Sequence, residues 1–318
     1  MKRAIARWQT WWLRLFVLTV LVAVALDIPT PFDLVLAAAF FALSLVRPPT
    51  SGGPPAGLAP SASDRVPVEL AQPPSGWAPV QLAPPVRGRW VAINSPGTAV
   101  PSHGVKAYGQ AFAVDLLMPT EGAPAKIGWS LRTRAPRAYA CFGAPVLAMA
   151  AGTVVRAVGA RRDHRSRDTW PSLIWMMTVE AFVREVGGAG WILGNHVIVE
   201  HDDGTFAAYA HLRKGSPMVR AGERVAAGQQ LAEVGNTGNT SEPHLHVQLM
   251  DRATPTAAAG LPMLWRGLIE EDRDPRWSTG EPKPTALAGF PESGRIFTAP
   301  AERSPAEVAA DQGGDVLD

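Results

Sequence analysis

Two largely apolar runs occupy the first 46 residues, and their pattern predicts a pair of membrane helices. Leu15–Leu26 follows a basic segment that holds three tryptophans, and Leu34–Val46 follows a Pro-containing turn with two aspartates. Both runs are apolar on all sides, and a basic flank with tryptophans beside an apolar run is typical of membrane insertion. We therefore expect residues 1–47 to form two short transmembrane helices arranged as a hairpin.

Two other interpretations of this segment stay open. The first run has the features of a cleaved signal peptide, with the small residues Ala23 and Ala25 at the cleavage site. It also fits a lone signal anchor whose second run lies in the membrane interface. A hairpin would return the chain to the side of its basic N-terminus, and such termini favour the cytoplasm.

The rest of the chain changes from a linker to short strands and then to a tail. Residues 48–87 are rich in Pro, Ala and Ser, which indicates a linker. From Gly88 onward, short runs rich in β-branched residues alternate with Gly, Pro and Asn turns, and this pattern predicts an all-β sandwich or barrel. We expect the domain to span residues 88–277, with residues 278–318 forming a mostly disordered tail.

One segment, about residues 160–190, interrupts the strand pattern with a helical insertion. A highly charged run, residues 161–168, leads into the apolar stretch 170–183, where Pro171 is suited to the first turn of a helix. His164 lies in the charged run and is expected to be solvated. The Trp- and Met-rich helix fits either packing on the sheet, which is the more common arrangement, or lying on a membrane surface; we favour packing on the sheet.

Composition excludes some classes of function. The chain has 30 basic and 28 acidic residues and a net charge of +2, whereas nucleic-acid-binding proteins concentrate Lys and Arg. Its 47% hydrophobic residues allow a sizeable core. The single cysteine, Cys141, forms no intramolecular disulfide, and its apolar surroundings predict a small buried residue.

The histidines are the best candidates for chemistry, because five of the seven lie between residues 195 and 246. His244 and His246 are separated by one residue, so on a strand they point to the same face. Adjacent imidazoles suit a metal ligand and a second catalytic group, and catalytic zinc sites use three protein ligands. His196 and His201 are at odd spacing, which places them on opposite faces and predicts structural roles.

Three motifs in order resemble the signature of the lysostaphin/LytM-type zinc endopeptidases. They are Tyr209-Ala-His-Leu212, Gly235-Asn-Thr-Gly-Asn239 and Pro243-His-Leu-His246, and the segment 195–204 is similar to the strand that precedes the hairpin turn in that family. The resemblance covers about residues 88–252, and the ordered combination is far more specific than a lone His-x-His. It implies a LytM-like β-sandwich/barrel hybrid.

The resemblance also implies roles for five residues. His246, the second histidine of His-x-His, would be a zinc ligand, while His244 and His211 would be the catalytic pair that moves the proton and stabilises the oxyanion. The upstream ligands in the family are a histidine and an aspartate, for which His103 and Asp115 are the candidates. Eleven residues separate them here instead of the commonest three. A longer loop adds little closure entropy, so this spacing is acceptable.

The function implied by the resemblance is that of a zinc-dependent metalloendopeptidase, a hydrolase that cleaves peptide bonds of bacterial peptidoglycan during cell-wall remodelling. Its partners would be peptidoglycan peptides and the membrane, without nucleic acid. It would be located at the cell membrane, with the catalytic domain on the extracytoplasmic side. The main alternative is a catalytically silent LytM-like module that binds the wall or activates an amidase. A candidate residue at all five positions favours the enzyme.

A third interpretation is a carrier-like β-barrel, because residues 221–228 resemble a turn of biotinyl and lipoyl domains. Such domains present a modifiable lysine at a hairpin tip. No lysine lies between Gly235 and Glu242, so this interpretation is disfavoured.

Overall fold

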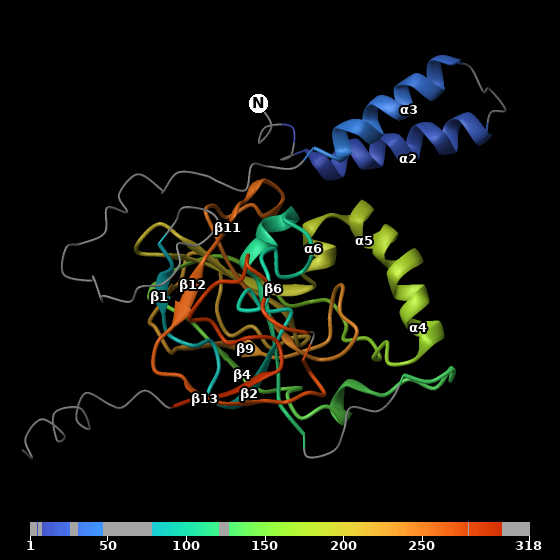
Figure 1. Ribbon diagram of the computed structural model, residues 1–318. Helices are drawn as coiled ribbons and strands as arrows, with labels where there is room; N and C mark the ends of the chain where they lie inside the picture. The colour runs from blue at the N-terminus through green and yellow to red at the C-terminus, as the bar shows by residue number, and fades with distance from the viewer. Residues whose placement is uncertain are drawn as a thin grey trace, which may run out of the picture.

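A computed structural model describes residues 5, 8–25, 31–46, 78–120, 127–278 and 280–300 (Figure 1). Most of the predicted linker, residues 47–77, and the end of the predicted tail, residues 301–318, lie outside the described residues. The described domain is built mainly of strands, which confirms the mostly β prediction.

A ten-stranded sheet, antiparallel throughout, forms the centre of the domain. Two two-stranded sheets, β1–β12 and β4–β9, accompany it. The segment 195–204, which resembles the family's strand before a hairpin turn, contains β6 and the turn to β7, and the motif 243–246 leads into β10. In spatial order the large sheet contains β13 (Ile269–Arg273), β14 (Arg295–Ala299), β2 (Gly88–Ile93), β3 (Val114–Leu117), β10 (Leu245–Met250), β7 (Phe206–Leu212), β6 (Asn195–His201), β5 (Gly152–Val158) and β8 (Arg224–Val225), with β11 (Gly260–Leu261) beside β10. The small sheets pair β1 (Val80–Leu82) with β12 (Met263–Trp265) and β4 (Pro145–Leu147) with β9 (Gln230–Glu233).

The central strand β10 shows why the sheet has two different faces. Leu245, Val247 and Leu249 are fully buried in the main hydrophobic core, which also takes in residues of the two small sheets. Because successive side chains of a strand alternate in direction, His246 and Gln248 project from the opposite face. The apolar residues therefore fix which face of the strand is left for polar groups.

The strand-bearing domain extends beyond the predicted limits 88–277 at both ends. Strand β1 precedes residue 88, and β14 lies in the stretch that we expected to be a tail. Ile296 and Phe297 of β14 are buried, and Phe297 pairs with Trp90 of β2. The disorder prediction is thus wrong for residues 280–300, because a five-residue strand within a Pro- and Glu-rich stretch carries little periodic signal.

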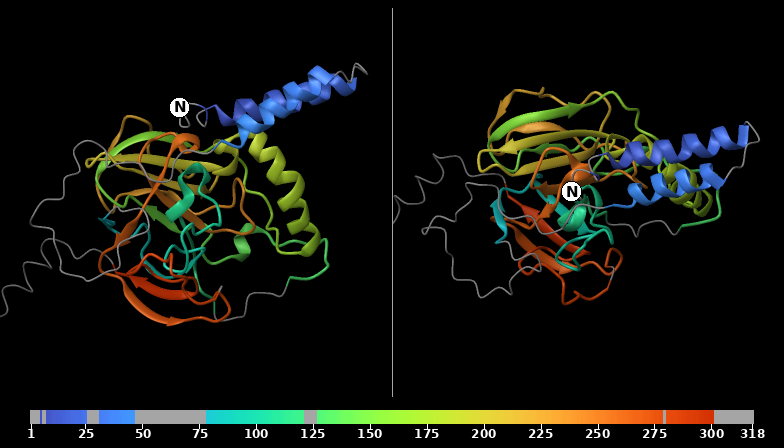
Figure 2. Two further views of the ribbon diagram at one scale, coloured as in Figure 1. Left: turned by 45° about the horizontal axis from the view of Figure 1, so that its top comes forward. Right: turned by 90° about the horizontal axis from the view of Figure 1, so that it is seen from above.

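The N-terminal segment contains two helices, α2 (Gln9–Ala25) and α3 (Pro31–Ser44), which lie side by side outside the β domain (Figures 1 and 2). Ring contacts between Trp12 and Phe40 and between Phe16 and Phe41 join them. Within the described residues, no helix has both the length and the apolar character needed to cross a membrane. The helix pair is as expected, but the transmembrane prediction is not supported, since α2 has 17 residues and α3 has 14 and a span takes ~20.

The helical insertion is present. It begins with α4 (Trp170–Trp175), continues through the π-helical turn η3 (Met176–Glu180) into α5 (Ala181–Gly187), and ends with the short α6 (Ala189–Ile192). Pro171 lies in the first turn, and the backbone N–H of Thr169 donates to Ser172 Oγ in a capping box. At the other end, the Arg14 guanidinium of α2 donates to the carbonyl oxygens of Val186 and Gly187. The insertion and the N-terminal helices are therefore in direct contact.

Burial of His196 on β6 predicts a specific loss of stability in acid. Its side chain is 2% exposed, and burial lowers its pKa from 6.5 to about 4. Because the folded state holds the ring neutral, this contribution is complete above about pH 6.5 and is lost as the pH falls toward 4. The loss is about 3 kcal/mol, at ~1.4 kcal/mol per pKa unit.

The variant His196→Asn keeps a donor for the Gly194 carbonyl, which lies 2.8 Å from His196 Nδ1. We expect its free energy of unfolding to fall less steeply than that of the wild type as the pH is lowered. Urea unfolding between pH 7 and pH 4.5 measures this slope. Parallel slopes for the variant and the wild type would contradict the assignment.

Candidate metal centre

Asp115 lies at the centre of the candidate site. It is on β3, directly opposite His246 on the antiparallel strand β10. The His246 Nδ1 atom is 2.9 Å from Asp115 Oδ1, and both side chains are almost fully buried. Strand pairing thus makes neighbours of two residues that are 131 positions apart in the chain.

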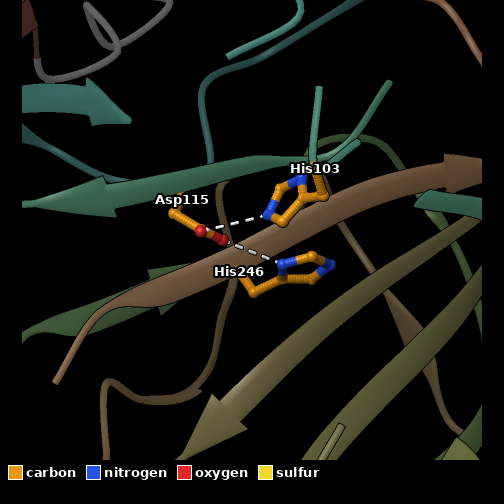
Figure 3. Close-up of side chains that lie close together, drawn as sticks. All are labelled: His103, Asp115 and His246. Atoms are coloured by element: carbon orange, nitrogen blue, oxygen red, sulfur yellow. Dashed lines mark hydrogen bonds and ion pairs between the residues drawn. The ribbon is translucent and has the colours of Figure 1, made fainter. Parts of the chain in front are cut away.

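His103 reaches the same carboxylate from the loop before η1 (Ala107–Phe112), with its Nε2 atom 3.0 Å from Asp115 Oδ2. Figure 3 shows the rings of His103 and His246 one above the other, each facing the carboxylate of Asp115. The Ser102 hydroxyl donates to the Ala113 carbonyl at 2.6 Å, and this hydrogen bond ties the His103 loop to the start of β3. The element η1 is formed by residues that lie between His103 and Asp115. Its fold brings the two ends of this wide spacing together.

Hydrogen bonds on the far side of each ring fix the positions of the ring protons. His103 Nδ1 lies 3.1 Å from Ser102 Oγ, whose own hydrogen is already donated, so the ring N–H donates to that oxygen. His246 Nε2 lies 3.0 Å from Gln248 Oε1, and the amide nitrogen of Gln248 donates to the Tyr108 carbonyl at 2.7 Å. The two ring nitrogens that face Asp115 therefore carry lone pairs.

This arrangement fits a divalent cation. The ligand atoms of His103, Asp115 and His246 all lie within 4.8 Å of one another. Two lone pairs and a carboxylate that converge in a buried site repel each other unless positive charge lies between them. Two imidazole nitrogens and one carboxylate are a known donor set for catalytic zinc.

The pKa shifts of Asp115 and His246 also indicate that the site favours positive charge. Burial alone would raise the pKa of Asp115, but positive charge on the imidazoles of His103 and His244 holds it well below its usual value, as do the hydrogen bonds that His103 and His246 donate when the nitrogens facing the carboxylate are protonated in place of a bound cation. Burial alone would lower the pKa of His246, yet the hydrogen bond and the charge of Asp115 raise it. The cluster therefore stabilises an ionised carboxylate and attracts a cation or a proton.

His211 and His244 form a second pair beside the first three residues. The ring centroids of His211 and His244 are 4.8 Å apart, and those of His211 and His246 are 5.6 Å apart. The backbone of His211 is left-handed, with φ of 62°, next to an irregularity in the β6–β7 register. Regular alternation would turn His211 to the core side with Tyr209, and the bulge turns it to the site instead.

Both rings of this pair donate a hydrogen bond from Nδ1, and His244 Nε2 lies 3.5 Å from Asp115 Oδ1. His211 Nδ1 donates to the Thr237 carbonyl at 2.8 Å, and His244 Nδ1 donates to the Glu242 carbonyl at 2.8 Å. Each Nε2 atom therefore carries a lone pair. Burial lowers the pKa of His244, and it lowers that of His211 to well below 6.5, so both rings are neutral at neutral pH. Each ring can accept a proton.

The five residues line a cavity of about 740 Å³. Five other parts of the chain contribute to its walls: the N-terminal helices, the loop after β2, the segment 105–110, the insertion and the loop 239–241. From the loop after β2, Asn94 Nδ2 donates to Asp115 Oδ2 at 2.8 Å. Apart from the five residues, the lining includes Leu13, Phe16, Phe41, Leu45, Asn94, Tyr108, Met176, Met177, Phe182 and Asn239.

The remaining histidines lie elsewhere. His196 and His201 are buried on β6 and bond to Gly194 and Thr205, away from the cluster. The expectation that His164 is solvated is wrong, because its ring is partly buried and its Nε2 atom lies 3.1 Å from the Gly238 carbonyl. The structure thus assembles the five predicted residues, and their separate roles stay predictions.

Sequence reasoning missed three residues that orient the site: Ser102, Asn94 and Gln248. Ser102 and Asn94 carry no signal of their own, since their contacts come from loop geometry. Gln248 did carry a sequence signal, because it continues the alternation of His244 and His246 along the same strand face.

The sequence model of Peptidase family M23 matches residues 178–258. This segment contains β6, β7 and β10 and three of the five residues: His211, His244 and His246. The segment therefore belongs to Peptidase family M23, and the recognition of a lysostaphin/LytM-type protein is confirmed.

Curated relatives match over short segments. Peptidoglycan DD-endopeptidase ShyA of Vibrio cholerae serotype O1 is 39% identical over 72 residues, which are 22% of this chain and 16% of that protein. Cell division protein DipM of Caulobacter vibrioides is 33% identical over 102 residues, 32% of this chain and 16% of that protein. The chain thus spans about a sixth of the length of these relatives.

Among solved structures, the catalytic domain of lysostaphin from Staphylococcus simulans overlaps with 52% of this chain and 84% of that chain, at 20% identity and a TM-score of 0.29. A TM-score that low carries no weight for the site or its activity.

Gln248 is expected to matter for metal binding although it is not a ligand. Residues that hold the outer nitrogen of a ligating histidine typically contribute 10- to 100-fold to metal affinity. We expect Gln248→Leu to weaken zinc binding by roughly that factor, because His246 loses the acceptor for its Nε2 proton. Competition with a chromophoric chelator measures the affinity.

Two further variants make this prediction specific. Gln248→Glu keeps an acceptor oxygen and should retain most of the affinity, while Gln230→Leu on β9 should leave it unchanged. Wild-type affinity in a folded Gln248→Leu protein would show that the Gln248 contact does not support the ligand.

Proposed function

We propose that this protein is a zinc-dependent endopeptidase that cleaves peptide bonds of bacterial peptidoglycan in cell-wall remodelling. The observation that carries the proposal is the convergence of two imidazole lone pairs on the buried Asp115 carboxylate, beside two neutral histidines whose Nε2 atoms carry lone pairs. Membership of residues 178–258 in Peptidase family M23 supports the reaction class. The substrate rests on the name of the relative ShyA, a peptidoglycan DD-endopeptidase.

The residues divide into a ligand set and a proton-transfer pair. His103 Nε2, the Asp115 carboxylate and His246 Nδ1 would hold the zinc ion. Bound there, zinc would supply Lewis acidity toward a water molecule and the scissile carbonyl. A neutral imidazole of the pair His211 and His244 accepts the proton of the attacking water. The resulting imidazolium donates a hydrogen bond to the oxyanion and returns the proton to the leaving amine.

Completeness of the site favours the enzyme over a catalytically silent wall-binding or amidase-activating module. A binding module needs neither three converging ligands nor two buried rings that are kept neutral. Burying these polar groups is costly unless they are paired or bind a cation. The arrangement is therefore best accounted for by catalysis.

We also propose that the domain acts at the cell membrane on its extracytoplasmic side, where peptidoglycan lies. The apolar helices α2 and α3 support the membrane location, since several of their large apolar side chains are exposed, among them Trp11, Leu18 and Val35. The name of the relative DipM, a cell division protein, fits an envelope role.

Three histidine variants of the full-length protein separate the two sets of residues. His246→Ala should lose both bound zinc and cleavage. His211→Ala should keep zinc but lose roughly 10²- to 10⁴-fold in cleavage rate, the usual contribution of a general base. His201→Gln, outside the site, should keep both. Zinc is measured by plasma mass spectrometry, and cleavage by chromatography of peptides released from purified peptidoglycan.

Undiminished cleavage by a folded His246→Ala protein would exclude the proposed centre. A wild-type protein that binds zinc in this centre but releases no peptide from any wall preparation would instead identify a silent module.

A further inference from the structure

The insertion helix formed by α4, η3 and α5 has its charged face turned toward the protein. Glu180, whose side chain is 17% exposed, forms ion pairs with Arg167 and with Arg184. Arg184 Nη1 also donates to Asn239 Oδ1 at 3.0 Å. Glu185 accepts a hydrogen bond from the Tyr108 hydroxyl at 2.6 Å. The charges of this helix are thus used in contacts with the domain and do not face solvent.

The outward side of the same helix is apolar. Met177 is 72% exposed and Phe182 is 51% exposed. The loop before the insertion continues this surface, because Trp129, 78% exposed, lies 6.4 Å from the ring of Trp170. A surface helix normally shows the reverse polarity. The exposed large apolar residues of this surface are Ile127, Trp129, Leu131, Trp170, Ile174, Trp175, Met177, Val179, Phe182, Val183 and Trp191.

The exposed charges of the segment that carries this surface are all positive. Within the described residues 127–192, every exposed charged residue is an arginine. The four acidic residues of this range are only partly exposed, and each accepts hydrogen bonds from elsewhere in the chain. An apolar helix face in a segment whose exposed charges are all arginines is complementary to a bilayer with anionic headgroups. The exposed arginines are Arg132, Arg134, Arg137, Arg156, Arg162 and Arg165.

The surface is continuous with the apolar N-terminal helices. Arg14 of α2 bonds to the last carbonyls of α5, and both views of Figure 2 place the pair α2–α3 at that end of the insertion. Two segments that lie more than a hundred residues apart thus present apolar side chains next to each other. Tryptophans at both ends, Trp11 on α2 and Trp170 on α4, suit a membrane interface.

We propose that the insertion helix and the loop 127–131 dock onto the surface of an anionic lipid bilayer. The apolar face would lie at the boundary of headgroups and acyl chains, and the arginines would contact the headgroup phosphates. Since Met177 and Phe182 also line the cavity over the candidate centre, docking would hold the cavity mouth at the bilayer. The proposal does not depend on the peptidase activity.

A fluorescent probe on the full-length protein tests this directly. Ile174→Cys places a thiol on the surface, and Ala227→Cys places one in an exposed turn outside it. The native Cys141 is 2% exposed, so it does not compete for the label. Each labelled protein is reconstituted with vesicles of phosphatidylcholine and phosphatidylglycerol. Quenching is then measured with nitroxide-bearing lipids and with aqueous iodide.

We expect nitroxide lipids to quench the probe at position 174 several-fold more than the probe at 227, with the reverse order for iodide. Pure phosphatidylcholine should reduce this difference. The double variant Arg137→Gln/Arg162→Gln should reduce it too, unlike the matched control Lys214→Gln/Arg220→Gln. Equal iodide quenching at both positions would show that the surface stays in water. A probe at 174 reached by neither quencher would show that protein covers it, and either result would overturn the proposal.

Discussion

The buried carboxylate of Asp115 is the group on which the candidate centre depends. A carboxylate with so little solvent is unfavourable by itself, and its ionised form is stabilised here by His103, His244, His246 and the amide of Asn94. Each partner is delivered by a different structural feature. The pairing of β3 with β10 delivers His246, and the fold of η1 delivers His103. The positions of the site residues therefore depend on the pairing of β3 with β10.

The insertion supports the site from the other side. The charged run before α4 bonds to the loop 235–242, because the Asn236 backbone N–H donates to Asp163 at 2.7 Å and the Arg167 backbone N–H donates to the Ser241 carbonyl. This loop supplies the carbonyls of Thr237 and Glu242 that orient the two proton-transfer histidines. Residues outside the family motifs thus help to fix the tautomers within them.

The same support explains the inverted polarity of the insertion helix. Glu180 and Arg184 point toward the domain and pair with each other. Glu180 connects the helix to Arg167, and Arg184 connects it to Asn239 of the motif loop. Partly buried ion pairs contribute little stability when their desolvation is counted, but breaking one partner is costly. They therefore specify how the helix sits, and the apolar residues are left on the outside. The arrangement joins the catalytic cavity to the surface proposed to meet lipid.

Part of this structure followed from sequence alone, because it depends on local periodicity. The pattern of short runs and turns predicted a mostly β domain, and strand alternation placed His244 and His246 on one face. The motif order indicated the family and three residues of the site, His211, His244 and His246. These features depend on residues that are close together in the chain, or on patterns that can be recognised without knowing which distant residues they contact.

The tertiary structure alone decided the features that depend on pairing between distant segments. The short strand β14 pairs with β2 and β13 and buries Phe297, although its sequence carries little signal. His211 faces the site only because a bulge with left-handed backbone breaks the alternation that would have turned it to the core. The meeting of His103 with Asp115 and the outward turn of the apolar helix face likewise come from long-range contacts, which no local pattern contains.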